Sequence, residues 1–272
     1  MIAAMMFPAM PNVGEDVSSL LFRWIHIVAG VLWIGLLYFF NFVNAELAKT
    51  YDADTKKKVV PELMPRALFF FRWGAAWTFI TGVLLWALLY LRQPNFSKTG
   101  VPERGPALAA LGLVVAAFLV YDAIAKALAK KPMAALWVWY LLVLAFVFVL
   151  GQTEFFAASN RAVYIHAGAM LGTAMAANVW MRIWPAQRRI ITAIKGGTAP
   201  DPADVAVAGM RSKHNTFMSV PLLFLMLSVH EAFVGLNFPD PFQPGMLVLG
   251  LMVVGYFGTD WLYKKSAKVK GF

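Results

Sequence analysis

The chain has 272 residues, of which 60% are hydrophobic and 14% charged, with no cysteine and a formal charge of +10. Its mean hydropathy of +0.65 predicts an integral membrane protein. Without cysteine, disulfides and covalently attached haem c are excluded. The positive charge does not indicate a nucleic-acid partner, because loop cations beside a lipid bilayer face anionic head groups.

Seven apolar runs are long enough to cross a bilayer, which takes about 20 helical residues. In chain order they cover residues 18–44, 67–92, 105–128, 133–151, 160–184, 213–234 and 245–263. The loops are short, so we expect an all-α transmembrane bundle and a single domain over residues 1–272. The first residues lack the features of a cleaved signal peptide, so the first span is expected to be retained.

Lysine and arginine are distributed unevenly between the two sets of alternate loops. Residues 45–66, 126–131, 182–213 and the carboxyl-terminal tail carry 18 of them, whereas the opposite set carries only Lys98, Arg104 and Arg161. Cytoplasmic loops are the ones enriched in these cations. The sequence therefore predicts a multi-pass protein of the bacterial inner membrane, with its amino terminus outside and its carboxyl terminus in the cytoplasm.

Two spans carry further expectations. The run 133–151 is apolar on every face, which predicts a lipid-facing helix with Trp137, Trp139 and Tyr140 in an interfacial aromatic belt. Pro221 lies inside the sixth run and should free a backbone carbonyl. Residues 185–211 are predicted to form a short helix followed by a turn.

Histidines lie inside or beside these apolar runs, where an ionisable side chain is costly and therefore suggests function. His26, His166 and His230 fall in one layer of the outer leaflet, within about 5 Å in depth. Such a layer predicts a non-covalent haem b with two of them as axial ligands, or a three-histidine metal site. Arg23 and Arg161 could pair with the haem propionates or anchor the helices at the interface. The alternative is that each histidine is a hydrogen-bonded packing residue.

A second polar set lies in the cytoplasmic third of the spans. His214 precedes His230 by about 24 Å and 160° of helix, so the two cannot share a metal. We expect Asp122 or Asp260 to neutralise Arg72, because buried charges require partners. As a functional alternative, Arg72, His214 and Asn215 could bind a planar anion and an aspartate could relay protons. The full set is Arg72, Asp122, Asn178, His214, Asn215 and Asp260.

Four stretches carry a resemblance to a known family: residues 23–35, 71–74, 166–180, and 212–216 continuing to His230. They resemble the membrane domain of the cytochrome c-linked urate oxidase (urate hydroxylase) family. The resemblance implies an inner-membrane bundle followed by one more span and a periplasmic cytochrome c domain. This chain has no Cys-x-x-Cys-His motif, so electrons would pass to a separate cytochrome c or respiratory partner. Val229 and Glu231 depart from the family pattern around the histidine, which indicates a changed substrate preference.

Two functions remain open from the sequence. The first is a haem b redox protein that oxidises a urate-like substrate and passes electrons outward. The second is a non-catalytic accessory subunit of a larger respiratory or photosynthetic complex, whose histidines hold at most a structural haem. A transporter is less favoured, because no inverted repeat is visible. An oligomer is compatible with each of these functions.

Overall fold

The computed structural model describes residues 13–93, 95–99, 104–228 and 243–270, which are almost entirely helical. Six helical segments in these ranges are long and apolar enough to cross a membrane. The predicted all-α membrane bundle is confirmed. The helices are α2 (Val13–Tyr38), α3 (Ala45–Leu47), α4 (Ala53–Trp86), α5 (Arg104–Ala127), α6 (Pro132–Gln152), α7 (Asn160–Asn178), α8 (Trp184–Lys195), α9 (Pro202–Ser228) and α10 (Gln243–Ser266).

The sixth predicted span differs most from the structure. Residues 213–228 of this span belong to α9, which begins at Pro202 rather than near residue 213, and the remaining residues of the span lie outside the described part of the chain. The six apolar segments do not include this helix. The predicted short helix of the preceding loop is α8, which follows α7 after the π-helical residues Val179–Ile183 and ends before a turn at Gly197 with φ +75°.

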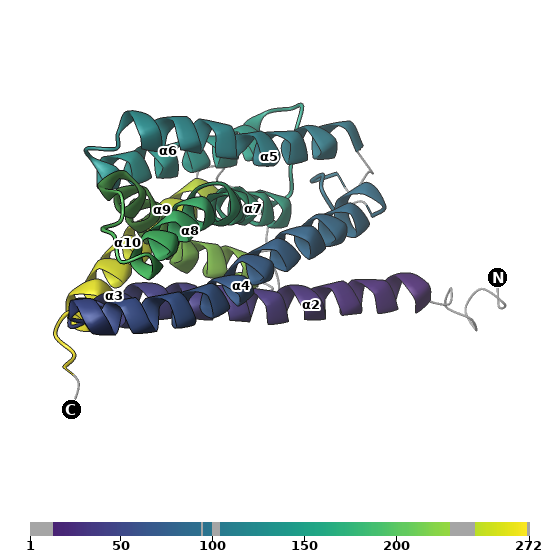
Figure 1. Ribbon diagram of the computed structural model, residues 1–272. Helices are drawn as coiled ribbons and strands as arrows, with labels where there is room; N and C mark the ends of the chain where they lie inside the picture. The colour runs from purple at the N-terminus through teal and green to yellow at the C-terminus, as the bar shows by residue number, and fades with distance from the viewer. Residues whose placement is uncertain (1–12, 94, 100–103, 229–242, 271–272) are drawn as a thin grey trace, which may run out of the picture.

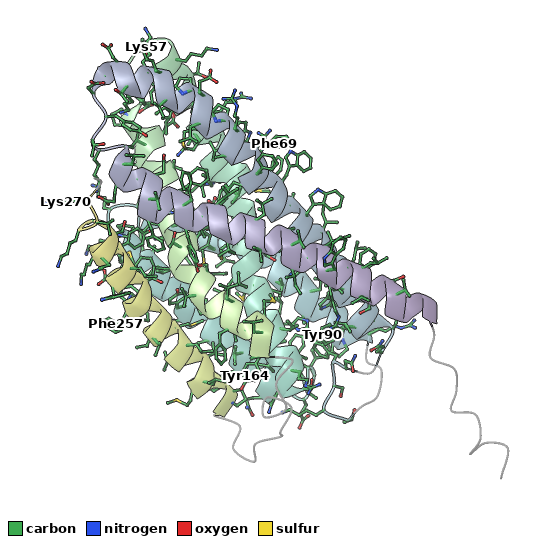
Figure 2. The ribbon with its side chains drawn as sticks, turned by 90° about the horizontal axis from the view of Figure 1, so that it is seen from below. Lys57, Phe69, Tyr90, Tyr164, Phe257 and Lys270 are labelled. Carbon is green, nitrogen blue, oxygen red and sulfur yellow. The ribbon has the colours of Figure 1, made fainter. Side chains whose placement is uncertain are left out.

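The helices form three layers (Figure 1). The long hairpin of α2 and α4 makes one outer layer, α5 and α6 make the other, and α7 to α10 lie between them. The central position of α7 agrees with the burial of most of its side chains, among them His166, Leu171 and Met175. Lys57 and Lys270 lie toward one end of the bundle, here called the basic end, and Tyr90 and Tyr164 lie toward the opposite end (Figure 2).

Close contact between α2 and α4 depends on Gly74. A β-carbon at this position would lie 3.2 Å from the Ala29 carbonyl oxygen and 3.2 Å from the Trp33 amide nitrogen. Backbone atoms cannot rotate away as a flexible side chain can, so any larger residue must push the two helices apart. The glycine therefore sets the spacing of the hairpin.

We expect Gly74→Leu to destabilise the protein by about 1–3 kcal/mol through overpacking. Gly35→Leu is the matched control, because a β-carbon at Gly35 of α2 would meet nothing within 4 Å. Thermal unfolding of both variants in detergent measures the difference. Equal melting temperatures would contradict the assigned role of Gly74.

Within the described ranges, three π-helical segments interrupt the α-helices: η1 (Phe39–Asn44), η2 (Ala87–Leu91) and η3 (Val179–Ile183). Such segments are rare in proteins, and those that occur often lie at functional sites. Each one here adjoins a polar contact. In η1, Asn41 donates to the Ser212 hydroxyl at 2.8 Å and accepts from the Tyr263 hydroxyl at 2.9 Å, which joins α2 to α9 and α10. The other two adjoin the candidate sites.

Helix α6 exposes one face, with Leu141 58% exposed, and buries the other. Trp139 and Tyr140 are fully buried, so the predicted interfacial belt is wrong for these two residues. The Tyr140 hydroxyl donates to the Phe217 carbonyl at 2.9 Å. This carbonyl lies four residues before Pro221, which has no amide hydrogen to bond it. The predicted free carbonyl is therefore confirmed, and a buried tyrosine satisfies it.

Candidate functional site

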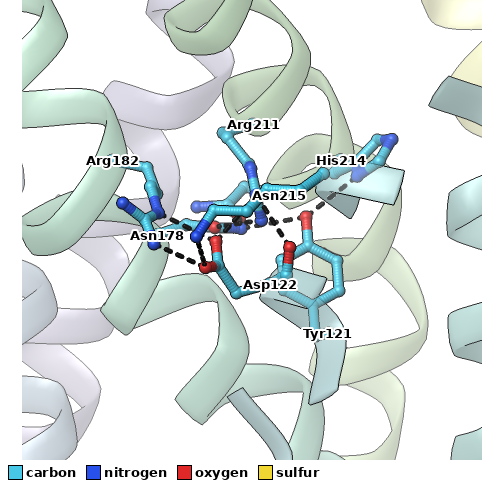
Figure 3. Close-up of polar contacts among 8 residues, drawn as sticks. Tyr121, Asp122, Asn178, Arg182, Arg211, His214 and Asn215 are labelled. Atoms are coloured by element: carbon cyan, nitrogen blue, oxygen red, sulfur yellow. Dashed lines mark hydrogen bonds and ion pairs between the residues drawn. The ribbon is translucent and has the colours of Figure 1, made fainter. Parts of the chain in front are cut away.

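A buried ion cluster lies around Asp122 of α5 (Figure 3). Arg182 of η3 binds both carboxylate oxygens, at 2.8 and 2.5 Å, and Arg211 of α9 binds one at 2.7 Å. Lys126 lies 2.8 Å from the same carboxylate. Asp122 is 6% exposed and Arg211 is 1% exposed. One buried carboxylate therefore joins α5, η3 and α9 and leaves a local excess of positive charge.

The predicted neutralisation of Arg72 is wrong. Asp122 binds Arg182, Arg211 and Lys126 instead, and Asp260 pairs with Lys264 one turn away on α10 at 2.6 Å. Depth along a span places residues at one height but does not decide which helix faces which. The rotation and packing of the helices selected different partners.

His214 is completely buried, and its hydrogen bonds fix its tautomer. Nε2 lies 2.8 Å from the Pro132 carbonyl oxygen, which can only accept, so Nε2 carries the proton. Nδ1 must then accept from the Tyr121 hydroxyl at 2.8 Å. The Tyr121 oxygen in turn accepts from the Asn178 amide at 3.1 Å. The imidazole thus ties α9 to α5 and α6 as a neutral group.

Asn178 and Asn215 complete this network. The Asn178 amide also donates to the Asn215 side-chain oxygen at 2.9 Å, and Asn215 donates to the Met175 carbonyl at 3.0 Å. The Asn178 oxygen accepts from Arg211 at 3.3 Å. A substrate role for His214 or Asn215 stays a prediction, and it would require one of these internal bonds to open.

Arg72 lies apart from both clusters, in an aromatic cage. Its guanidinium carbon is 4.0 Å from the centre of the Trp184 ring and 5.7 Å from those of Trp180 and Phe69. Its backbone carbonyl accepts from the Trp180 indole at 2.9 Å. Its Nε is buried without a hydrogen-bond partner, and no carboxylate pairs with it among the described residues. The cage therefore holds a cation with unused donors.

His166 of α7 is completely buried at the opposite end of the bundle. Its Nδ1 donates to the Ala162 carbonyl at 2.7 Å, and its Nε2 accepts from the Trp86 indole at 2.8 Å. The rings of Trp86, Tyr90 and Phe96 surround it, with centres 5.1 to 6.3 Å away. Both ring nitrogens are therefore occupied within the chain.

His26 of α2 has a different environment. It is partly buried, and its Nδ1 lies 3.2 Å from the Thr81 hydroxyl of α4. Gly82 leaves room for the ring, since a β-carbon there would lie 3.2 Å from His26 Cε1. Thr81 and Trp86 are separated by about 7.5 Å along α4 and about 140° around it. His26 and His166 therefore approach α4 from different sides.

These contacts test whether the outer layer fits a haem. An axial histidine needs a free nitrogen lone pair, and its other nitrogen usually donates to a neighbour. His166 has no free nitrogen, so the described residues do not fit a haem held between His26 and His166. His230 lies outside the described residues. Those residues also contain no group of three or more His, Cys, Asp or Glu side chains that could hold a metal.

The two predicted propionate partners differ in their surroundings. Arg23 is partly buried, and its Nε donates to the Ser19 hydroxyl at 3.3 Å. Arg161 is exposed at the start of α7. Pairing with haem stays a prediction for both residues.

Several important residues were not identified from the sequence. Arg182 and Arg211 were counted only as loop cations, although Arg211 shares a helix face with His214 and Asn215 at spacings of three and four. Tyr121 directly precedes Asp122 in the sequence, and a polar aromatic residue next to a charged residue inside a span could have been included in the candidate set. Trp86 and Tyr90 looked like ordinary apolar residues of a span, and no sequence pattern marks them as partners of His166.

The fold and its buried polar networks define a polytopic helical membrane protein in which Arg72 lies in an aromatic cage. The sequence model of the urate oxidase N-terminal family matches residues 50–270. The chain therefore belongs to the urate oxidase N-terminal family. No curated protein and no solved structure matches the chain.

Proposed function

We propose that this chain is a redox protein of the bacterial inner membrane that binds urate, or a closely related planar anion, at Arg72. Electrons then pass to a separate cytochrome c or respiratory partner, with a non-covalent haem b as the redox group. The family match supports the substrate class. The observation that carries the site is the unneutralised Arg72 in its aromatic cage.

The chemistry of the cage suits such a ligand. A guanidinium presents forked N–H donors to the oxygens of a planar anion, and its own face stacks on an aromatic ring. Urate is flat and anionic, with carbonyl oxygens at its edge and a face that can stack on Trp184. The separate Asp122 cluster has three cations for one carboxylate, and this excess of positive charge favours the approach of an anion.

The reaction balances with a one-electron acceptor outside the chain. Hydroxylation of urate removes two electrons and releases two protons, and water supplies the added oxygen atom. Two molecules of an oxidised cytochrome c would each take one electron. A bound haem b would supply one-electron transfer between the substrate and this partner. The chain's own contribution is to bind and orient the anion and to hold it away from bulk water.

We expect Arg72→Gln to weaken urate binding about 10- to 100-fold, because hydrogen bonds to a charged group contribute about 1.5–3 kcal/mol. Isothermal titration of the detergent-purified chain with urate measures the affinity. Arg188→Gln on α8 is the control, because Arg188 is exposed. An unchanged affinity in Arg72→Gln, or equal losses in both variants, would contradict the assigned site.

An accessory subunit is the second candidate function, and one surface favours it. An apolar groove of about 470 Å³ runs between α2 and α4, lined among others by Trp24, Trp73 and Trp77. These three indoles are 63%, 41% and 50% exposed, and a transmembrane helix of a larger complex would pack there. Copurification with such a complex, together with no urate binding, would favour this function over the first.

A further inference from the structure

We propose that the Asp122 cluster binds an anionic phospholipid at the basic end of the bundle, with the lipid phosphate between Lys126 and Arg182 and an acyl chain along the exposed face of α5. The chemistry that the cluster recognises is a phosphate group, and the surrounding surface favours a lipid as its source. This site is separate from the Arg72 cage, and the proposal depends on neither urate binding nor a haem.

The cluster holds more positive than negative charge. Lys126, Arg182 and Arg211 all pair with the single carboxylate of Asp122, and in the described part of the chain no second carboxylate pairs with them. Arg211 is 1% exposed, and its Nε is buried without a hydrogen-bond partner. Basic pockets between helices at the membrane surface bind the head groups of anionic lipids. The excess positive charge therefore favours a phosphate that binds from outside the chain.

Two of the three cations keep donors that a ligand can reach. Lys126 Nζ and Arg182 Nη2 both contact Oδ2 of Asp122, at 2.8 and 2.5 Å, so the two side chains lie within reach of one phosphate group. These side chains are 59% and 33% exposed. Nζ has two further protons, and Nη1 of Arg182 forms no hydrogen bond with the described residues. Phosphate oxygens can accept from both groups, and hydrogen bonds between ionised partners are the strong ones.

The surface of α5 beside the cluster favours a lipid over a soluble phosphate. Lys126 lies in the last turn of α5, which ends on the side of the bundle where α4 begins and α10 ends (Figure 1). Leu119 and Val115 precede it by seven and eleven residues, so all three lie on one face of the helix. The two apolar side chains are 70% and 51% exposed. Lys130 and Lys131 follow and are exposed. A lipid would use both the cations and this apolar face, whereas free phosphate would use only the cations.

The test is a titration of the delipidated, detergent-purified chain with phosphatidylglycerol, followed by native mass spectrometry and thermal unfolding. Phosphatidylcholine with the same acyl chains is the zwitterionic control, and inorganic phosphate and glycerol 3-phosphate represent a soluble source. We expect phosphatidylglycerol to bind and to raise the melting temperature, as a ligand of the folded state does. The other three compounds should have much smaller effects. Equal binding of phosphatidylcholine, or an equal rise in melting temperature with either soluble phosphate, would overturn the assignment to an anionic lipid.

Two lysine variants locate the site. Lys126→Gln should weaken phosphatidylglycerol binding about 10-fold through loss of a charge-assisted hydrogen bond. Lys264→Gln is the matched control, because Lys264 also pairs with an aspartate one turn before it, Asp260, and is 73% exposed. Each variant removes one positive charge, so a diffuse attraction to lipid would fall equally in both. Equal affinities of the two variants would overturn the proposal. Arg182→Gln should also weaken binding, and Lys126→Gln decides the matter if that variant does not fold, because Asp122 then keeps two arginine partners.

Discussion

Asp122→Ala is expected to lower the free energy of unfolding by about 3–5 kcal/mol, because removing one member of a buried ion cluster leaves uncompensated charge. Arg211 is the most affected partner, since it is 1% exposed and would lose its carboxylate. Total stabilities are only about 5–15 kcal/mol. We therefore expect a large fall in melting temperature or failure to fold.

The control for this prediction is Asp260→Ala. Asp260 forms an ion pair with Lys264 on the same helix, and that lysine side chain is 73% exposed. Exposed pairs contribute little, so this variant should melt almost like the unmodified chain. Both variants remove one carboxylate from the bundle, and thermal unfolding in the same detergent compares them. Equal destabilisation would contradict the structural role of the Asp122 cluster.

Trp86→Ala is expected to cost about 3–5 kcal/mol, the usual range for removal of a buried aromatic ring. Trp86 is 6% exposed and donates to Nε2 of His166. Trp86→Phe keeps a six-membered ring but removes the indole N–H and part of the buried ring volume, so it should cost about 1–3 kcal/mol, in part through the unsatisfied imidazole. The difference between the two variants measures the contribution of the aromatic ring that phenylalanine retains.

Trp77→Ala is the matched control on the same helix. Trp77 is 50% exposed, and its ring faces the apolar groove rather than the centre of the bundle. We expect a much smaller change in melting temperature, measured by circular dichroism. If Trp77→Ala lowered the melting temperature as much as Trp86→Ala, the contact between Trp86 and His166 would not explain the effect of Trp86→Ala.

The membrane-spanning segments and the all-α fold class could be predicted from hydropathy, because a lipid environment requires long apolar helices. The start of helix α9 shows a limit of this reasoning, because the helix begins at Pro202, before the apolar run near residue 213. Its buried face carries Arg211, His214 and Asn215, whose partners lie on other helices. Hydropathy also did not show which side chains of α6 are buried, and Trp139 and Tyr140 are among them.

The candidate sites could be predicted in part. Depth separated His214 from the outer layer, and its contacts at Pro132, near the start of α6, agree with that separation. Depth could not show that His26 and His166 approach α4 from different sides, because helix rotation is set by packing. Nor could it show that Asp122 would bind Arg182 and Arg211, leaving Arg72 without a carboxylate. These features depend on tertiary contacts between residues far apart in the chain.

The most direct test of the proposed function is anaerobic turnover in proteoliposomes with urate and oxidised cytochrome c. We expect urate-dependent reduction of cytochrome c, with two cytochromes reduced per urate consumed and activity lost in Arg72→Gln but kept in Arg188→Gln. No reduction by folded, haem-loaded protein that binds urate would contradict the redox function.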